Sequence, residues 1–165
     1  MERGYVIMTI QDSGNRTEFE SGAVRDCGEG KGRCDLLPLD IVASHLDDRV
    51  ITFLGNYQKT ANPACLAWAL GGFLANAKCP FRNAPDMYLE VSKHFEEGAK
   101  KYSERNWEKG IPEERYIDSA VRHYLKWLRG DTDERHDRAF VWNVICLMWT
   151  HKHITEKVTD DVATL

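Results

Sequence analysis

Residues 116–149, with the sequence YIDSAVRHYLKWLRGDTDERHDRAFVWNVICLMW, decide the fold of this chain. Two segments in which apolar residues recur every three or four positions flank a short polar loop at residues 130–135, and this pattern predicts a helical hairpin. In the second segment His136, Phe140 and Asn143 follow an i, i+4, i+7 spacing among apolar neighbours. An asparagine in such surroundings must find a hydrogen-bond partner.

The sequence before this hairpin also has a helical pattern. Helices are expected at about residues 39–53, 63–77 and 87–102, with a proline-containing loop at 79–85 and a connector at 106–112. Strand signals are scarce, and only residues 5–10 have the pattern of a short strand. We therefore expect an all-α fold, a helical bundle.

At 165 residues with 42% apolar content, the chain is most simply one globular domain. Residues 1–30 are rich in glycine and polar residues, so we expect a flexible N-terminal arm that is either mobile or draped over the body. The domain is expected to span residues 31–155, and a tail to span residues 156–165.

Composition excludes several classes of protein. The 22 basic and 26 acidic residues leave a net charge of -4, which is not the charge of a general DNA- or RNA-binding protein. The five cysteines are odd in number and form no C-x-x-C pair, so we expect reduced thiols and a cytoplasmic location. The sequence has no signal-peptide pattern and no apolar run of about 18 residues, which predicts that no segment spans a membrane.

Carboxylates and imidazoles recur beside the apolar stripes. The groups are Glu90, His94 and Glu97 on one helix face, Asp118 with Arg122 on another, and His136 with Asp137 at the start of the last helix. Brought together inside a bundle, such ligands would form a site for Mg²⁺ or Mn²⁺. The alternative is a solvated face with Glu–Lys pairs four residues apart, such as Glu96–Lys100 and Glu97–Lys101. We expect Asp118 and His136 to be functional, because each lies at the edge of an apolar stripe.

Basic residues gather at two places. Lys100, Lys101, Tyr102, Arg105 and Asn106 end the third expected helix, and Lys31 and Arg33 lie among glycines before the first. Either group is suited to phosphate, although cations at a helix end and charges in a solvated linker are also common without a ligand. Trp107 lies in a polar connector, where it either stacks on a base or fills a helix corner.

These residues resemble a known family. Three strings, FEEGAKKYSERNWEKGIP at 95–112, YIDSAVRHYLKWLRGD at 116–131 and HDRAFVWN at 136–143, closely resemble the phage and bacterial dATP/dGTP diphosphohydrolase domain family. The string KGRCDLLP at 31–38 is similar to the N-terminal signature of that family. Residues 44–86 look like an insertion between the signature and the core.

That family in turn resembles the MazG-like all-α nucleoside triphosphate pyrophosphatases, whose E-E-x-x-E and E-x-x-D patterns hold Mg²⁺. On this chain only Asp118 is a carboxylate at a matching position, since His136 and Ala139 stand where the pattern has Glu and Asp. Asp137 and Glu97 are expected to supply the missing oxygens.

The resemblance implies hydrolysis of a purine (deoxy)nucleoside triphosphate between its α and β phosphates, in nucleotide pool control or phage modified-purine synthesis. Mg²⁺ or Mn²⁺ would be the cofactor, and a homodimer or homotetramer is implied. The implied roles are metal binding by Asp118, His136, Asp137 and Glu97, orientation or deprotonation of water by His123 or Glu97, phosphate binding by Lys100, Lys101, Arg105 and Arg122, and base recognition by Asn106, Trp107 and Asn143. Lys31, Arg33 and Tyr102 complete the expected substrate contacts.

Two other classes of function stay open. A non-catalytic helical module that binds nucleotide would carry the same basic residues, and it would differ in releasing no pyrophosphate. A phage regulatory or DNA-binding protein is the other class, and the net charge of -4 counts against it.

Overall fold

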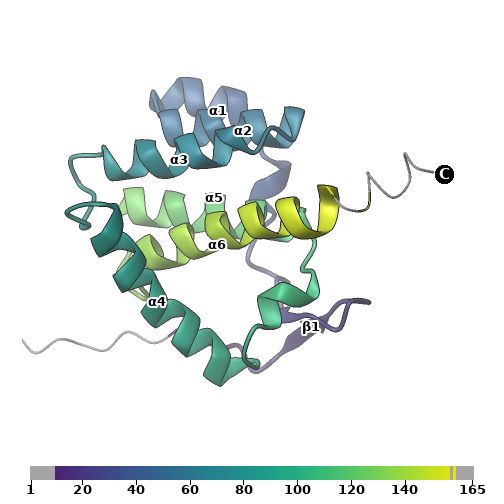
Figure 1. Cartoon of the computed structure of the whole chain (residues 1–165). Helices are drawn as coiled ribbons and strands as arrows, with labels where there is room; N and C mark the ends of the chain where they lie inside the picture. The colour runs from purple at the N-terminus through teal and green to yellow at the C-terminus, as the bar shows by residue number, and fades with distance from the viewer. Residues whose placement is uncertain (1–9, 157, 159–165) are drawn as a thin grey trace, which may run out of the picture.

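The helical hairpin predicted at residues 116–149 lies at the centre of the computed structural model, which describes residues 10–156 and 158 (Figure 1). Its first helix, α5, spans Glu113–Arg129 and its second, α6, spans His136–Thr150. Gly130 ends α5 with a φ of 90°, and its amide donates to the carbonyls of Lys126 and Trp127. Glycine adopts this left-handed conformation without strain, which lets the chain reverse there.

Three shorter helices cover one side of this hairpin. They are α1 (Leu39–Leu46), α2 (Arg49–Thr60) and α3 (Ala64–Leu74). The single helix expected at residues 39–53 is wrong, because Asp47 takes a left-handed φ of 49° and ends α1. Asp48 then caps α2, its Oδ1 accepting from the amide of Ile51 at 3.0 Å. An aspartate at the N-cap stabilises the start of a new helix. The apolar periodicity alone did not reveal this break between α1 and α2.

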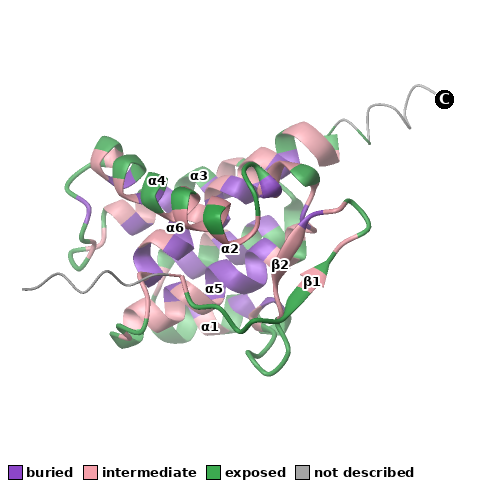
Figure 2. Cartoon of the chain, turned by 90° about the horizontal axis from the view of Figure 1, so that it is seen from below, coloured by how far each residue is buried: buried purple, intermediate pink, exposed green. Residues whose placement is uncertain are grey.

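Residues 44–86, which looked like an insertion, pack on the hairpin, and Phe73 makes several of the contacts. The ring of Phe73 on α3 contacts the rings of Tyr124, Trp127 and Phe140 edge-on, with centroids 4.8–6.1 Å apart. Figure 2 shows the buried residues gathered along α5 and its neighbours. The three helices are therefore part of the same core as α5 and α6.

Helix α4 (Ala84–Lys101) begins three residues before the expected position and runs obliquely past α6 (Figure 1). Asn83 caps it, its Oδ1 accepting from the amide of Asp86 at 2.9 Å. The connector after it holds a short 3-10 helix, η2 (Asn106–Lys109). Another, η1 (Cys34–Leu36), packs against α5, and a π-helical turn, η3 (His151–Thr155), follows α6.

The expected flexible arm contains a β-hairpin. Strands β1 (Arg16–Glu18) and β2 (Val24–Asp26) pair antiparallel, with Thr17 opposite Arg25. Asn106 holds β2 to the helices, because its Oδ1 accepts from the Val24 amide at 2.9 Å and its Nδ2 donates to the Val24 carbonyl at 2.7 Å. The sequence pattern placed a strand only at residues 5–10, most of which lie outside the described residues.

The all-α expectation is confirmed, since helices form most of the described chain and the sheet has two short strands. In the described residues, no helix combines the length and apolarity that crossing a membrane requires. All five cysteines lie in the described part of the chain and are free.

Candidate active site

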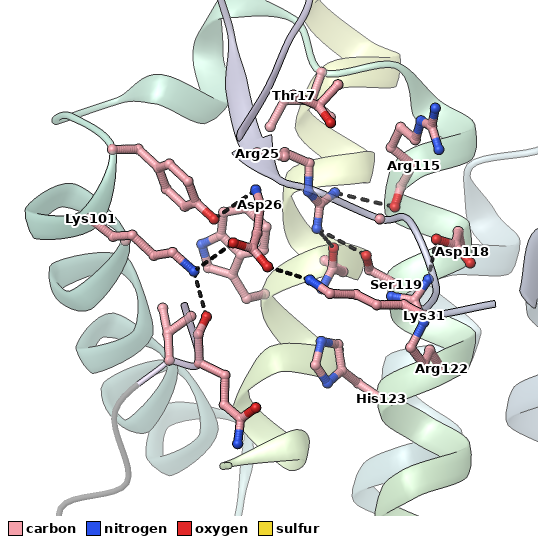
Figure 3. A pocket seen from close by; sticks show the side chains of 18 of the residues that line it. Thr17, Arg25, Asp26, Lys31, Lys101, Arg115, Asp118, Ser119, Arg122 and His123 are labelled. Atoms are coloured by element: carbon pink, nitrogen blue, oxygen red, sulfur yellow. Dashed lines mark hydrogen bonds and ion pairs between the residues drawn. The ribbon is translucent and has the colours of Figure 1, made fainter. Parts of the chain in front are cut away.

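A cavity of about 330 Å³ lies between the β-hairpin, α4, α5 and α6 (Figure 3). Its walls hold many polar, charged and aromatic side chains. Those that bear on its chemistry are Arg25 and Asp26 from β2, Lys31 from the following loop, His94 and Lys101 from α4, Arg115, Asp118, Ser119, Arg122, His123 and Lys126 from α5, Asp133 and Glu134 from the loop after it, and Trp142 and Asn143 from α6.

Arg25 is the residue that the sequence analysis missed and that shapes this cavity most. Its guanidinium donates to the carbonyl of Arg115 at 3.2 Å, to Ser119 Oγ at 3.1 Å and to Asn143 Oδ1 at 2.9 Å (Figure 3). It also lies over the ring of Trp142, 5.7 Å from the centroid. All these partners are neutral, and no carboxylate in the described residues forms an ion pair with it. The wall of the cavity thus carries a cation whose charge is uncompensated, and burial lowers the pKa of that guanidinium.

Asn143, expected to read a base, instead orients this guanidinium. Its Oδ1 accepts from Arg25, and its Nδ2 donates to the Ala139 carbonyl at 2.7 Å. The buried asparagine therefore has the hydrogen-bond partners that its apolar surroundings require.

Lys101 and Lys31 approach the same carboxylate from opposite sides (Figure 3). Lys101, whose side chain is 7% exposed, lies 3.6 Å from Asp26 Oδ1, and Lys31 forms an ion pair with the other oxygen. Burial raises the pKa of Asp26, but its hydrogen bonds to Lys31 and Ser13 outweigh this and hold the pKa below its usual range. Burial also lowers the pKa of Lys101. An anionic ligand that enters would compete with Asp26 for both ammonium groups.

Asp118 ties α5 to the loop that carries Lys31. Its Oδ1 accepts from the amide of Cys34 at 2.7 Å, and its Oδ2 pairs with Arg122, which also donates to the Gly32 carbonyl at 3.2 Å. Both oxygens of this buried carboxylate are therefore engaged by the protein.

Two residues that line the cavity each have a buried N–H group without a hydrogen-bond acceptor among the described residues. Arg122 Nε and Trp142 Nε1 lack a hydrogen bond within the described chain, as does Thr150 Oγ1 elsewhere. Buried N–H groups are rarely left unsatisfied in native proteins. Both residues line the cavity, while these two N–H groups are themselves buried from solvent.

At one end of the cavity, two imidazoles meet a carboxylate. His123 Nδ1 lies 3.0 Å from His136 Nδ1 and 3.1 Å from Glu134 Oε1. Burial lowers the pKa of His123 to about 3. Burial also lowers the pKa of His136, yet its hydrogen bonds to Glu134 and Asp133 outweigh this and raise it above the usual value. Glu134 and Asp133 lie in the loop at residues 130–135, where no periodicity pointed to a function.

A protein-family model described as dATP/dGTP diphosphohydrolase, N-terminal, matches residues 77–161. The chain belongs to this family. No curated protein and no solved structure matches the chain. The match covers the cavity residues from α4 to α6, and it leaves Arg25, Asp26 and Lys31 of this diphosphohydrolase domain outside.

The cavity brings together about half of the residues expected from the sequence. Those that line it are Lys31, Lys101, Tyr102, Asn106, Asp118, Arg122, His123 and Asn143. The Tyr102 hydroxyl oxygen accepts from the Asp26 amide at 3.0 Å, and Asn106 holds β2, so both support the hairpin that carries Arg25.

Other expected substrate contacts lie elsewhere. Lys100 pairs with Glu96 on the exposed face of α4, Arg105 pairs with Glu108, and Arg33 pairs with the buried Asp35. Trp107 packs edge-on against Phe95 and Trp149, so it fills a helix corner as in the alternative considered above. Trp142 is the tryptophan that reaches the cavity.

The four expected metal ligands do not come together in the structure. Asp137 pairs with Arg135, and Glu97 accepts from the amide of Ile10 at 3.0 Å. Asp118 is engaged as described, and only His136 belongs to a group of possible ligands. His136 and Asp137 are adjacent on a helix, where successive side chains point about 100° apart, so they cannot both face the same point easily.

Proposed function

We propose that this domain hydrolyses purine deoxynucleoside triphosphates, dATP or dGTP, between the α and β phosphates to monophosphate and pyrophosphate. The observation that carries the proposal is the guanidinium of Arg25, which has only neutral partners and lies on a cavity wall with Lys31, Lys101 and Arg122. Six basic side chains line this cavity against four carboxylates, and this local excess of positive charge in a chain of net charge -4 favours a polyanionic ligand.

The size and the donors of the cavity support a nucleotide. About 330 Å³ is within the range of small-molecule sites. The cations would bind the triphosphate, and the ring of Trp142, which lines the cavity, is suited to the base. In this proposal the guanidinium and ammonium groups stabilise the negative charge that spreads over the phosphate oxygens in the transition state.

Attack at the α phosphate also requires a water molecule that is oriented and loses a proton. Of the expected groups, His123 lines the cavity and Glu97 does not. We assign this task to the end of the cavity where His123 and Glu134 meet, 3.1 Å apart. Their separation and the place of both residues in the cavity wall support the assignment.

A Mg²⁺ or Mn²⁺ site at Asp118, Asp137 and Glu97 does not fit, because each of these carboxylates is already engaged by an arginine or a backbone amide. We derive no step through a metal at those residues. The dimer or tetramer that the MazG-like resemblance implies stays a proposal, and light scattering would measure it.

The experiment is incubation with each of the eight common NTPs and dNTPs, with Mg²⁺ or Mn²⁺ or with EDTA, and separation of the products. We expect monophosphate and pyrophosphate from dATP or dGTP, and loss of turnover in EDTA. Diphosphate with orthophosphate would contradict α–β cleavage. Binding without any product would favour the non-catalytic nucleotide-binding module.

A further inference from the structure

Three atoms that carry lone pairs form a small triangle at the junction of α5 and α6. They are Nδ1 of His123, Nδ1 of His136 and Oε1 of Glu134, and they are separated by 3.0, 3.1 and 3.5 Å. The side chains are largely buried, with 17%, 1% and 12% of their surface exposed in that order. They come from α5, from the first position of α6 and from the loop between them, so the hairpin turn itself assembles the triangle.

A fourth residue determines which nitrogen of His136 is free. Nε2 of His136 lies 2.7 Å from Asp133 Oδ1, so the ring donates its Nε2–H to that carboxylate, and in the neutral ring Nδ1 is then an acceptor. Such a carboxylate–histidine pair is the arrangement that orients imidazole ligands at metal centres.

With that tautomer, the triangle has more acceptors than donors. His123 Nδ1–H can be donated either to His136 Nδ1 or to Glu134 Oε1. The other two lone-pair atoms then face each other without a hydrogen between them, which costs free energy in a buried site. Either a proton on His136 Nδ1 or a metal cation among the three atoms removes this deficit.

The triangle also has the size of a metal site. Metal–nitrogen and metal–oxygen distances of about 2.0–2.2 Å place neighbouring donor atoms about 3.0–3.4 Å apart at octahedral and tetrahedral centres. The three separations of 3.0, 3.1 and 3.5 Å agree with this spacing.

We propose that His123, Glu134 and His136 bind a divalent first-row transition-metal ion of the Zn²⁺, Co²⁺ or Fe²⁺ class, with Asp133 orienting His136. Two imidazoles and one carboxylate favour these ions over Mg²⁺, which prefers oxygen ligands. Binding of the ion does not depend on the proposed function. Its place beside the triphosphate does, because His123 and Glu134 line the proposed nucleotide cavity.

A second possible group, Asp131 with Asp133 and His136, shares a residue with this one. Asp131 already forms an ion pair with Arg129, and the side chain of Asp133 is 39% exposed. The buried triangle is the better site, and Asp131 supplies a matched control.

The test uses the full chain, stripped with chelator and dialysed, and then mixed with Co²⁺, Zn²⁺ or Mg²⁺. Retained metal is measured by elemental analysis after gel filtration, and bound Co²⁺ also by its visible absorption. We expect one equivalent of Co²⁺ or Zn²⁺ per chain and no retained Mg²⁺. Failure to retain Co²⁺ and Zn²⁺ would leave a hydrogen-bonded imidazole–carboxylate network only and would overturn the proposal.

Variants locate the ion. Glu134→Gln and His136→Gln are expected to weaken Co²⁺ binding by 10²-fold or more, and Asp133→Asn by about 10- to 100-fold. Asp131→Asn and His94→Gln, the latter a histidine of the same cavity outside the triangle, should bind Co²⁺ as the parent does. Circular dichroism establishes that each variant folds, and the isosteric Glu134→Gln keeps the test valid should His136→Gln not fold. Equal binding by Glu134→Gln and the parent would contradict the site.

The same samples separate this proposal from the proposed function. Retained Co²⁺ without hydrolysis of any nucleotide would sink the function and leave the site standing. Hydrolysis that proceeds unchanged in Glu134→Gln, with no retained metal in the parent, would sink the site and the water-activating role of Glu134, and would leave α–β cleavage by this domain standing.

Discussion

Arg25 on β2 donates a hydrogen bond of 2.9 Å to Asn143 on α6, a residue 118 positions further along the chain. The contact joins the β-hairpin, which lies outside the region matched by the family model, to α6, which lies inside it. It also satisfies an asparagine that is 1% exposed. One hydrogen bond thus explains both the buried amide and the position of the cation in the cavity wall.

Replacement of this cation is expected to remove nucleotide binding. In Arg25→Met the charge is lost, and we expect nucleotide affinity and kcat/KM to fall by about 10²-fold, the scale of one charge-assisted contact to phosphate. Arg25→Lys keeps the charge without the planar geometry and should lose about tenfold. Calorimetric titration with dGTP in chelator measures binding. Parent-like affinity in Arg25→Met would contradict the role that we assign to this residue.

Two adjacent lysines on α4 offer a matched pair. Lys101 faces the cavity with 7% of its side chain exposed, whereas Lys100 is 71% exposed and pairs with Glu96. We expect Lys101→Met to lower kcat/KM by about 10- to 100-fold, because a cation near the phosphates is lost. Lys100→Met should change it less than twofold, since exposed ion pairs contribute little. Equal losses in both variants would place the phosphates outside this cavity.

Asp118→Asn is expected to affect stability first. The substitution removes the negative charge that Arg122 pairs with in a largely buried position, at a cost of about 3–5 kcal/mol. The melting temperature should therefore fall. The double variant Asp118→Asn/Arg122→Gln should recover part of the loss, because it leaves no unpaired guanidinium. A variant that melts like the parent but has lost turnover would instead assign Asp118 to the chemistry.

The lowered pKa of His94 predicts that the folded state becomes less stable in acid. Burial lowers its pKa to about 4, with Glu134 and Asp137 raising it and Arg138 and Arg25 lowering it further. In the unfolded chain its pKa is near 6.5, so between pH 6.5 and 4 the unfolded state binds more protons and the free energy of unfolding falls as the pH falls. Above pH 6.5 His94 is mostly neutral in both the folded and the unfolded state, so it causes little loss of stability there.

The difference between the parent and His94→Gln isolates this effect from other groups. Relative to its own value at pH 7.5, the parent should lose about 2 kcal/mol more unfolding free energy by pH 4.5 than His94→Gln does. Urea unfolding in chelator at both pH values measures the difference. Parallel losses in the two proteins would mean that His94 is protonated in the folded state.

Much of the fold could be predicted from residues 116–149. Apolar residues every three or four positions define which side of a helix is buried, and Gly130 marks the end of the first helix, so the α5–α6 hairpin follows from local sequence. The family resemblance was read from the same region, and the family model matches it. His123 and His136 were likewise identified from the sequence, although as members of different groups.

The tertiary structure alone decided which polar groups share a site. The short strands of the β-hairpin carry no periodic signal, and long-range hydrogen bonds, among them those of Asn106, Tyr102 and Arg25, hold them in place. Glu134 lies in a loop, where its partner imidazoles come from two helices. Local sequence determines helices because their hydrogen bonds and buried faces involve near neighbours, whereas a site depends on distances between residues far apart in the chain, which only packing determines.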